Sequence, residues 1–233
     1  MSCWSNNRSA RGSALVYILI AIALLAALTV TFMQPSGQQT TSQSSFRTTA
    51  DLESQANQIR AVIQKCVLSF PKGDNNITDP GARKNYPIDP DSTYYNGASP
   101  GRSGDQLVKN LRCPGNNPGS PNEKDHALLF SAISGDFLPP KPDLFNDWEY
   151  YNGDGGIFFW TKTDKTDPFI ASALEKLDDK FSECEADVID ARSGAVNMES
   201  GGTKCPAGNT CFRVIILKGT NTNYFGDEAA AGC

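Results

Sequence analysis

Residues 13–33 read SALVYILIAIALLAALTVTFM, and none of these side chains carries a charge. At about 1.5 Å of rise per residue, a helix of this length reaches about 30 Å, the thickness of a bilayer's hydrocarbon core. Arg8 and Arg11 precede the run, and no Lys or Arg follows before Arg47. Because positively charged flanks stay in the cytoplasm, the sequence predicts a single-pass inner-membrane segment with a cytoplasmic N-terminus and an exported remainder.

Two other structures also contain apolar runs. A secretory signal peptide usually has an apolar region of about 7–15 residues and a small-x-small cleavage site after it. The run here is longer, and residues 29–34 contain no such site. A buried core helix rarely stays uncharged on every face over this length. Cys3 precedes the run instead of closing it, so it is not the lipid-modified cysteine of a lipoprotein.

The order of features at the N-terminus is specific. A polar leader carries Arg8 and Arg11 and ends at Gly12, and the apolar run begins at once with Ser13. This arrangement resembles the leaders of type IV prepilins and of the pseudopilins of type II secretion systems. The resemblance implies that a prepilin peptidase cuts after Gly12 and leaves Ser13 as the new, methylated terminus. It also implies assembly with other pilin or pseudopilin subunits through the N-terminal helix.

Two positions depart from the family pattern. The families commonly begin the mature chain with Phe and place a Glu four residues later, where its carboxylate neutralises a neighbour's terminal amine. This chain has Ser13 and Tyr17 at those positions. Because an uncompensated ammonium is costly in an apolar bundle, the departure favours a minor subunit at the tip or in an initiating complex. Pro35 lies near the helix-kinking proline of many pilins, although Pro35 and Gly37 would also end a helix.

The chain beyond the apolar run has a helical pattern of its own. Residues 38–49 are rich in Gln, Ser and Thr, which is typical either of a continuing helix or of a short linker. From Asp51, apolar residues recur at the spacing of a helix that buries one face, and Pro71 ends the pattern. The residues on this face are Ile59, Val62, Ile63, Cys66, Val67 and Phe70.

An aromatic pattern in the second half of the chain predicts a β-hairpin. Residues 148–151 and 157–160 are rich in aromatic side chains, and they flank the turn-forming residues 152–156. We expect these aromatic side chains to pack the sheet against the helix, in preference to stacking on bases or sugars.

Two more elements follow the hairpin. Asp167 and Pro168 are typical of a helix start, and apolar residues then recur at helical spacing. These residues are Ile170, Ala173, Leu174, Leu177, Phe181 and Cys184. Residues 212–217 form an apolar run that predicts a central strand, and residues 188–189 indicate a shorter one.

These patterns predict an α+β fold. A long N-terminal transmembrane and spine helix would pack on a small antiparallel β-sheet, with a second helix and long loops. The predicted organisation is a prepilin-type leader over residues 1–12, a transmembrane helix over residues 13–35, its periplasmic continuation over residues 36–70 and a globular head over residues 71–233. Residues 71–104 are rich in Pro and Gly, which predicts either a contact surface or a tolerated insertion.

The cysteine count agrees with export. The chain has seven cysteines, and six remain when Cys3 leaves with the leader (7 − 1 = 6). An even set predicts up to three disulfides in an oxidising compartment, with 15 possible pairings. One of these pairings closes the short loop from Cys205 to Cys211. A zinc site is the alternative, but there is no CxxC pair and a single histidine, His126. The six cysteines are Cys66, Cys113, Cys184, Cys205, Cys211 and Cys233.

Composition argues against several other functions. The formal net charge is −5 and the basic residues are scattered, so we expect no nucleic-acid partner. Catalytic histidine chemistry would have to involve His126, and no phosphate loop, HExxH or GxSxG motif is present. Asp143, Asp147 and Asp154 could bind calcium, but they lack the EF-hand spacing and are typical of turn carboxylates. We expect no cofactor, no metal and no catalytic residue.

The sequence therefore favours a structural subunit over an enzyme. By resemblance it is a minor pilin or pseudopilin of a type IV pilus or type II secretion machine, with its head in the periplasm or on an extracellular filament. The alternative is an unprocessed single-span envelope protein whose head binds a ligand or partner. An envelope enzyme is a third possibility.

Overall fold

The computed structural model contains two units, Met1–Gln43 and Ser44–Cys233, and each is described by itself. The predicted leader before residue 10, Pro35, the loop over residues 71–104, His126, Asp154 and Cys233 lie outside the described residues. The residues that the structure describes are 10–33, 37–70, 107–113, 128–153, 156–182, 184–200, 202, 204–219, 222–225 and 232.

The first unit contains helix α1, Ala10–Met33. Among the described residues, no helix is long and apolar enough to cross a membrane. The predicted fold class, with its long transmembrane helix over residues 13–35, is therefore wrong, and it is corrected to α+β with three α-helices and a small antiparallel sheet among the described residues.

Helix α2, Gly37–Ser69, begins 14 residues before Asp51, where the apolar pattern begins. Residues 38–49 are thus helical, and no linker separates them from the apolar part. Their buried positions are polar: Thr49 Oγ1 donates to the carbonyl oxygens of Ser45 at 2.9 Å and of Ala173 at 3.0 Å. The rest of the buried face is largely apolar, as predicted, and comprises Leu52, Ala56, Ile59, Val62, Ile63 and Cys66.

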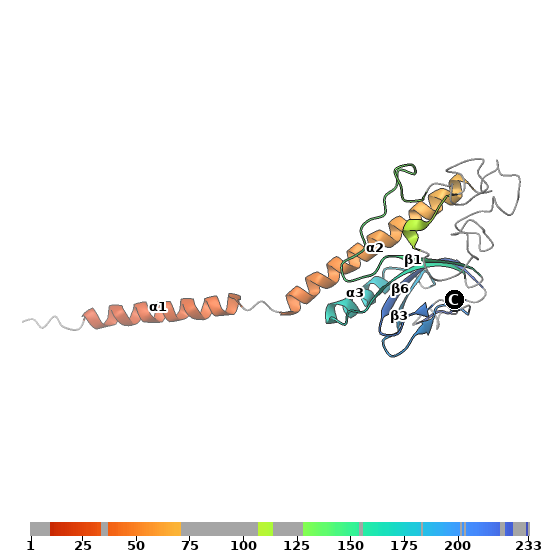
Figure 1. Cartoon of the computed structure of the whole chain (residues 1–233). Helices are drawn as coiled ribbons and strands as arrows, with labels where there is room; N and C mark the ends of the chain where they lie inside the picture. Colours follow the sequence, from red (N-terminus) through yellow and green to blue (C-terminus); the bar gives the residue numbers. More distant parts are fainter. Residues whose placement is uncertain are drawn as a thin grey trace, which may run out of the picture. The chain divides into compact units, whose positions relative to one another are not determined.

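The second unit is built on an antiparallel sheet with the strand order β1-β2-β6-β3 (Figure 1). The hairpin prediction is confirmed, since Glu149 pairs with Trp160 and Gly153 with Gly156. The central-strand prediction is confirmed as well, because β6 lies between β2 and β3. The strands are β1 (Glu149–Gly153), β2 (Gly156–Thr163), β3 (Ala186–Asp190) and β6 (Thr210–Lys218), and a separate pair is formed by β4 (Val196–Asn197) and β5 (Lys204–Cys205).

Helix α3, Pro168–Asp178, starts where the sequence predicts, with Asp167 at the N-cap and Pro168 in the first turn. It is shorter than the apolar pattern suggests, because the helix ends before Phe181 and Cys184. Cys184 has a positive φ of 72°, which is incompatible with a continuing helix. A short 3₁₀ turn, η1 (Val108–Asn110), precedes the sheet, and Val108 N–H donates to the Trp148 carbonyl at 2.9 Å.

The four-stranded sheet is buried on both faces. Helices α2 and α3 cover one face, which we call the helix-side face (Figure 1). The β4–β5 hairpin and residues 222–225 cover the other, the hairpin-side face. Alternation along the strands assigns the residues to faces. The helix-side face carries Tyr150, Ile157, Phe159, Ala186, Phe212 and Val214, and the hairpin-side face carries Tyr151, Phe158, Trp160, Ile189, Cys211 and Ile215.

A hydrogen-bonded tryptophan joins α2 to the helix-side face. Trp148 Nε1 donates to Gln55 Oε1 at 2.8 Å, and Gln55 Nε2 donates to the Pro140 carbonyl at 2.7 Å. The Trp148 ring packs edge-on against Phe159 and Phe212. Because the polar atoms of Trp148 and Gln55 satisfy each other, this side chain fixes α2 on the sheet without an unpaired buried donor.

At the first residue of β2, the backbone lies very close to the end of β6. Gly156 has a φ of +99°, and a Cβ at this position would lie 2.5 Å from the Leu217 carbonyl oxygen and 2.7 Å from the Gly219 nitrogen. Both the backbone conformation and the space therefore require glycine here.

Candidate functional site

Helix α1 is the most apolar exposed element in the part of the chain that the structure describes. Its side chains from residue 15 to residue 29 are all exposed. Large apolar side chains on every side of the helix are between 50% exposed, at Ile20, and 72% exposed, at Tyr17. A continuous apolar surface of this kind marks a site of interaction, because leaving it in water is unfavourable.

The predicted processing residues lie at the start of α1. The bond between Gly12 and Ser13 lies in the first turn of the helix, which starts at Ala10. The first four N–H groups of a helix have no partner within it, so this turn opens most readily. Tyr17 follows one turn later, with its side chain exposed. Pro35 lies outside the described residues, so the helix kink expected there stays a prediction.

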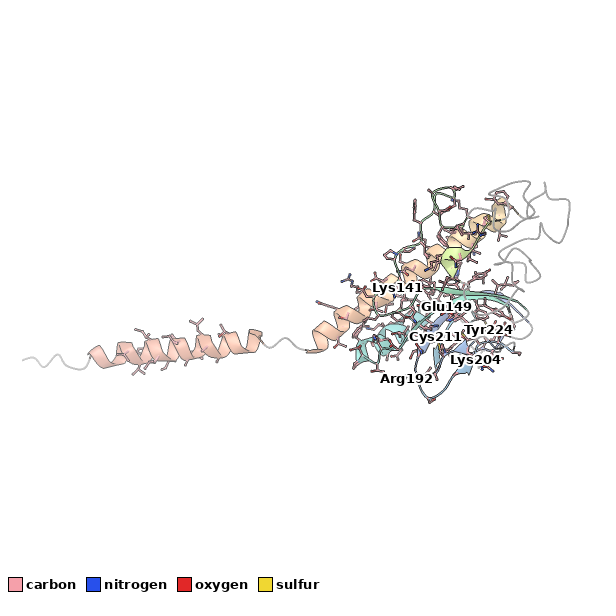
Figure 2. The ribbon with its side chains drawn as sticks, viewed as in Figure 1. Lys141, Glu149, Arg192, Lys204, Cys211 and Tyr224 are labelled. Carbon is pink, nitrogen blue, oxygen red and sulfur yellow. A yellow bond between two sulfur atoms is a disulfide. The ribbon has the colours of Figure 1, made fainter. Side chains whose placement is uncertain are left out.

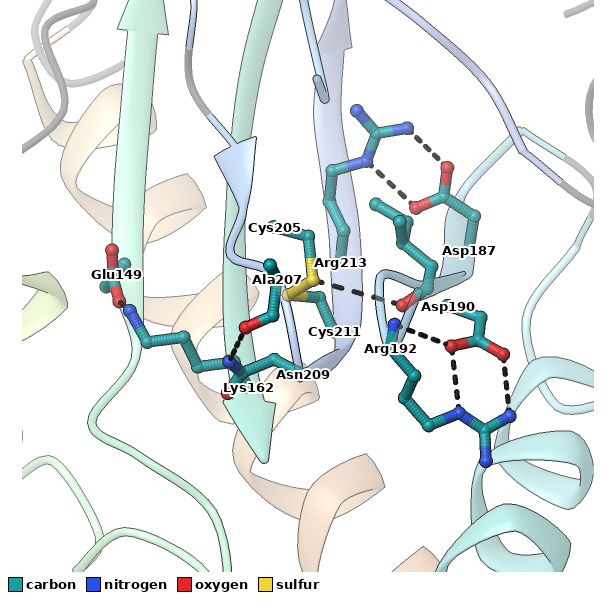
Figure 3. Close-up of a disulfide and its surroundings, with 11 residues drawn as sticks. Glu149, Lys162, Asp187, Asp190, Arg192, Cys205, Ala207, Asn209, Cys211 and Arg213 are labelled. Atoms are coloured by element: carbon teal, nitrogen blue, oxygen red, sulfur yellow. Dashed lines mark hydrogen bonds and ion pairs between the residues drawn. A yellow bond between two sulfur atoms is a disulfide. The ribbon is translucent and has the colours of Figure 1, made fainter. Parts of the chain in front are cut away.

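Two disulfides link described residues of the head. Cys66 near the end of α2 is bonded to Cys113, with a Cα–Cα distance of 5.9 Å. Cys205 on β5 is bonded to Cys211 on β6, with a Cα–Cα distance of 6.0 Å (Figure 3). This bond is one of the 15 pairings that the cysteine count leaves open. Cys184 is also disulfide-bonded.

A buried ion pair, which no local sequence pattern predicts, lies on the hairpin-side face. The side chains of Arg213 on β6 and Asp187 on β3 are both fully buried (Figure 3). Arg213 Nε donates to Asp187 Oδ1 at 2.8 Å, and its Nη2 donates to Oδ2. The same guanidinium donates to the carbonyls of Met198, at 2.8 Å, and Asn223, at 2.6 Å. Arg213 thereby joins the central strand to the segments that cover this face.

Aromatic rings complete the surroundings of Arg213. Its guanidinium carbon lies 5.0 Å from the Phe158 ring centroid, 5.9 Å from Tyr224 and 5.6 Å from Phe225. Burial raises the pKa of Asp187 above its ordinary value, and the hydrogen bonds from Arg213 oppose that rise. The signal that could have found this site is the one charged residue within the apolar run of residues 212–217.

A groove of about 270 Å³ lies between α3 and β3, and we call it the α3–β3 groove. Its apolar lining includes Ile170 and Leu174 of α3 and Val188 of β3. Asp190 and Arg192, the latter labelled in Figure 2, line one end. Arg192 donates two side-chain hydrogen bonds to the Asp190 carboxylate at 2.9 and 2.6 Å (Figure 3). These bonds lower the pKa of Asp190 to about 2.

The carboxylates considered for calcium are not gathered into a site in the described structure. Lys109 Nζ donates a hydrogen bond to Asp147 Oδ2 at 2.9 Å and forms an ion pair with it. Asp143 lies in the loop before β1. Among the described residues, no three His, Cys, Asp or Glu side chains are grouped closely enough to hold a metal ion.

The chain was compared with protein-family models, curated proteins and solved structures. No family model, no curated protein and no solved structure matches it.

Proposed function

We propose that this protein is a non-enzymatic assembly subunit of the pilin or pseudopilin kind, with a minor or tip role. In this proposal, α1 packs against the apolar helices of neighbouring subunits, and the disulfide-bonded head is presented outside the cytoplasm. The observation that carries the proposal is the exposure of large apolar side chains all around α1. A helix apolar on every side needs several apolar neighbours, and a bundle of identical or related helices supplies them.

The head supports the exported half of the proposal. The two described disulfides, Cys66–Cys113 and Cys205–Cys211, are of a kind that persists in oxidising compartments and is rare in the cytosol. The polar leader that ends at Gly12 supports processing by a prepilin peptidase, with Ser13 as the new terminus.

The minor or tip role depends on Tyr17. A subunit that repeats along a filament must neutralise each buried terminal amine, and a phenol does so poorly compared with a carboxylate. A subunit at the end of a filament has no neighbour above it whose amine needs a partner. In this proposal, the protein is present at low copy number, and Tyr17→Glu is not required for assembly.

The test compares two substitutions of similarly exposed apolar residues. Leu19 on α1 is 58% exposed and Phe46 on α2 is 63% exposed. Leu19→Glu places a charge in the packed helices and should abolish recovery of the protein with purified filaments. Phe46→Glu is the control, and because Lys176 lies 4.3 Å from the Phe46 ring, this position has a cation nearby and should tolerate the charge. Equal recovery of the two variants would contradict the proposal.

Mass spectrometry of the same filaments reports processing and copy number. The expected protein begins at Ser13 and is a minor component. A chain that keeps residues 1–12 would instead favour an envelope protein that binds partners without filament assembly. If the chain is the most abundant subunit of the filament, the argument from Tyr17 to a minor role is wrong.

A further inference from the structure

The outer edge of β3 is open in the described sheet. β3 is the last strand in the order β1-β2-β6-β3. Ile215 N–H donates to the Glu185 carbonyl at 2.8 Å, and Ala191 N–H donates to the Asn209 carbonyl at 2.9 Å. These bonds fix the antiparallel register in which Asp187 pairs with Arg213. Since hydrogen-bonding direction alternates along a strand, the odd-numbered residues bond to β6, and Ala186, Val188 and Asp190 direct their main-chain groups outward.

The open edge adjoins an apolar wall. Helix α3 lies beside β3, and Ile170, Leu174 and Val188 line the α3–β3 groove between them. A strand added to β3 would therefore extend the sheet beneath α3 and place every second side chain against these residues. An open strand edge beside a helix is a geometry in which extended peptides bind, because the edge supplies main-chain bonds and the groove supplies side-chain contacts.

The usual protections of an edge strand are weak on β3. A charge pointing into the sheet discourages edge pairing, but the inward charge of Asp187 is already neutralised by the buried Arg213 of the same sheet. β3 contains no proline and has no bulge in its pairing with β6. The remaining protection is its five-residue length.

The charges around the groove indicate which strand would fit. Its lining contains four acidic and two basic side chains. Both basic residues are already paired with acids, Lys165 with Asp164 at 3.0 Å and Arg192 with Asp190 at 2.6 Å. Glu175 is exposed on α3 and takes part in none of the described ion pairs. The electrostatic match is thus a strand that carries basic side chains.

We propose that the α3–β3 groove binds an extended basic segment of a partner protein, which adds to β3 as a further antiparallel or parallel strand. Apolar side chains at alternate positions of this segment contact Ile170, Leu174 and Val188, and a lysine or arginine pairs with Glu175. The proposal depends on the sheet edge and stands whether or not the protein is a pilin.

The first experiment uses the full-length chain and a short fluorescent peptide with threonine at every second position and with valine and lysine sharing the positions between, so that valine and lysine side chains point to the same face of an added strand. Fluorescence anisotropy measures its affinity at low salt, and amide exchange measures protection of the main chain. The peptide should bind and protect the amides of Val188 and Asp190. The same peptide with N-methyl groups on the amides that face β3 should bind about tenfold more weakly or less, since it loses main-chain hydrogen bonds. Replacing its lysines by glutamate should also weaken it.

Substitutions in the protein separate an edge site from nonspecific attraction. Val188→Pro removes the outward N–H and should weaken the peptide about tenfold, whereas Val188→Thr keeps the N–H and a β-branched side chain and should bind within about threefold of the wild type. Glu175→Lys changes an exposed side chain and should weaken the lysine peptide about threefold or more without altering the fold.

Three results would overturn the proposal. One is equal affinity for the peptide and its N-methylated form, and another is the absence of measurable binding by the lysine peptide. The third is concentration-dependent protection of Val188 and Asp190 without peptide, which would assign the edge to a second copy of this chain.

Discussion

The two faces of the sheet are both buried, but they are stabilised differently. The helix-side face is apolar, and Trp148 and Gln55 satisfy its central polar contact by a neutral hydrogen bond. The hairpin-side face contains the fully buried Arg213 and Asp187 and is covered by short segments. On the helix-side face, apolar packing orients helices α2 and α3 against the sheet. On the hairpin-side face, the covering segments are short. The Arg213 guanidinium orients them by donating hydrogen bonds to the carbonyls of Met198 and Asn223.

Removing one member of the buried ion pair should have the largest effect in this comparison. Asp187→Ala leaves the guanidinium of Arg213 buried without its counter-ion, and we expect a loss of about 3–5 kcal/mol in the free energy of unfolding. Chemical denaturation of the full-length chain measures it. The matched variant combines Asp187→Ala with Arg213→Met, which replaces the pair with apolar groups and should recover much of the loss. A double variant as unstable as the single one would show that Arg213 acts through its carbonyl contacts instead.

The disulfides of the two faces should differ in their contributions. The Cys66–Cys113 bond, among the core residues of the helix side, closes a loop of 47 residues, and Cys205–Cys211 on the hairpin side closes one of 6. If the bonds act by restricting the unfolded chain, replacing both cysteines by alanine should cost about 4 kcal/mol for the first and about 2 kcal/mol for the second. Unfolding of each double variant under oxidising conditions measures the difference. Equal losses would reject the loop-length explanation for this protein.

The smallest expected effect concerns the exposed pair at the edge of the sheet. The hydrogen bonds from Arg192 hold the pKa of Asp190 at about 2, below the ordinary value of about 3.9. A depressed carboxyl pKa contributes stability that is present above about pH 4 and lost as the pH falls toward about 2. Because both side chains are exposed, the contribution should stay below about 1 kcal/mol.

Arg192→Gln is the control for this pH dependence. It removes the ion pair, so the difference in stability between wild type and variant should shrink as the pH falls from about 4 to about 2. A constant difference across this range would mean that Arg192 stabilises the protein by packing and not by its charge.

The sequence predicted the elements whose buried positions are apolar. The aromatic hairpin, the central strand of residues 212–217 and the start of the second helix all follow patterns in which burial and hydrophobicity coincide. The Cys205–Cys211 bond was one of the pairings that the cysteine count allowed. These features depend on local spacing, so they could be recognised without knowledge of the tertiary contacts.

The sequence failed where polar residues are buried. The first half of α2 hides Ser45 and Thr49 against α3, and their hydroxyl groups replace the apolar pattern that would have predicted a helix there. Arg213 is buried because Asp187 and two carbonyls lie around it, which no local pattern reveals. The opposite failure occurred at residues 13–35, where the length of the apolar run predicted a transmembrane helix that the described structure does not contain.

Gly156 affects how sequence variation in relatives of this protein would be interpreted. Any other residue at this position would need a positive φ and would place its Cβ against the backbone after β6. In a collection of evolved or randomised variants, this position should therefore appear invariant for reasons of backbone geometry alone. Variation at the groove and invariance at Gly156 would carry different meanings: if the groove binds a peptide, the first would record a change of partner, and the second records only the close approach of two strands.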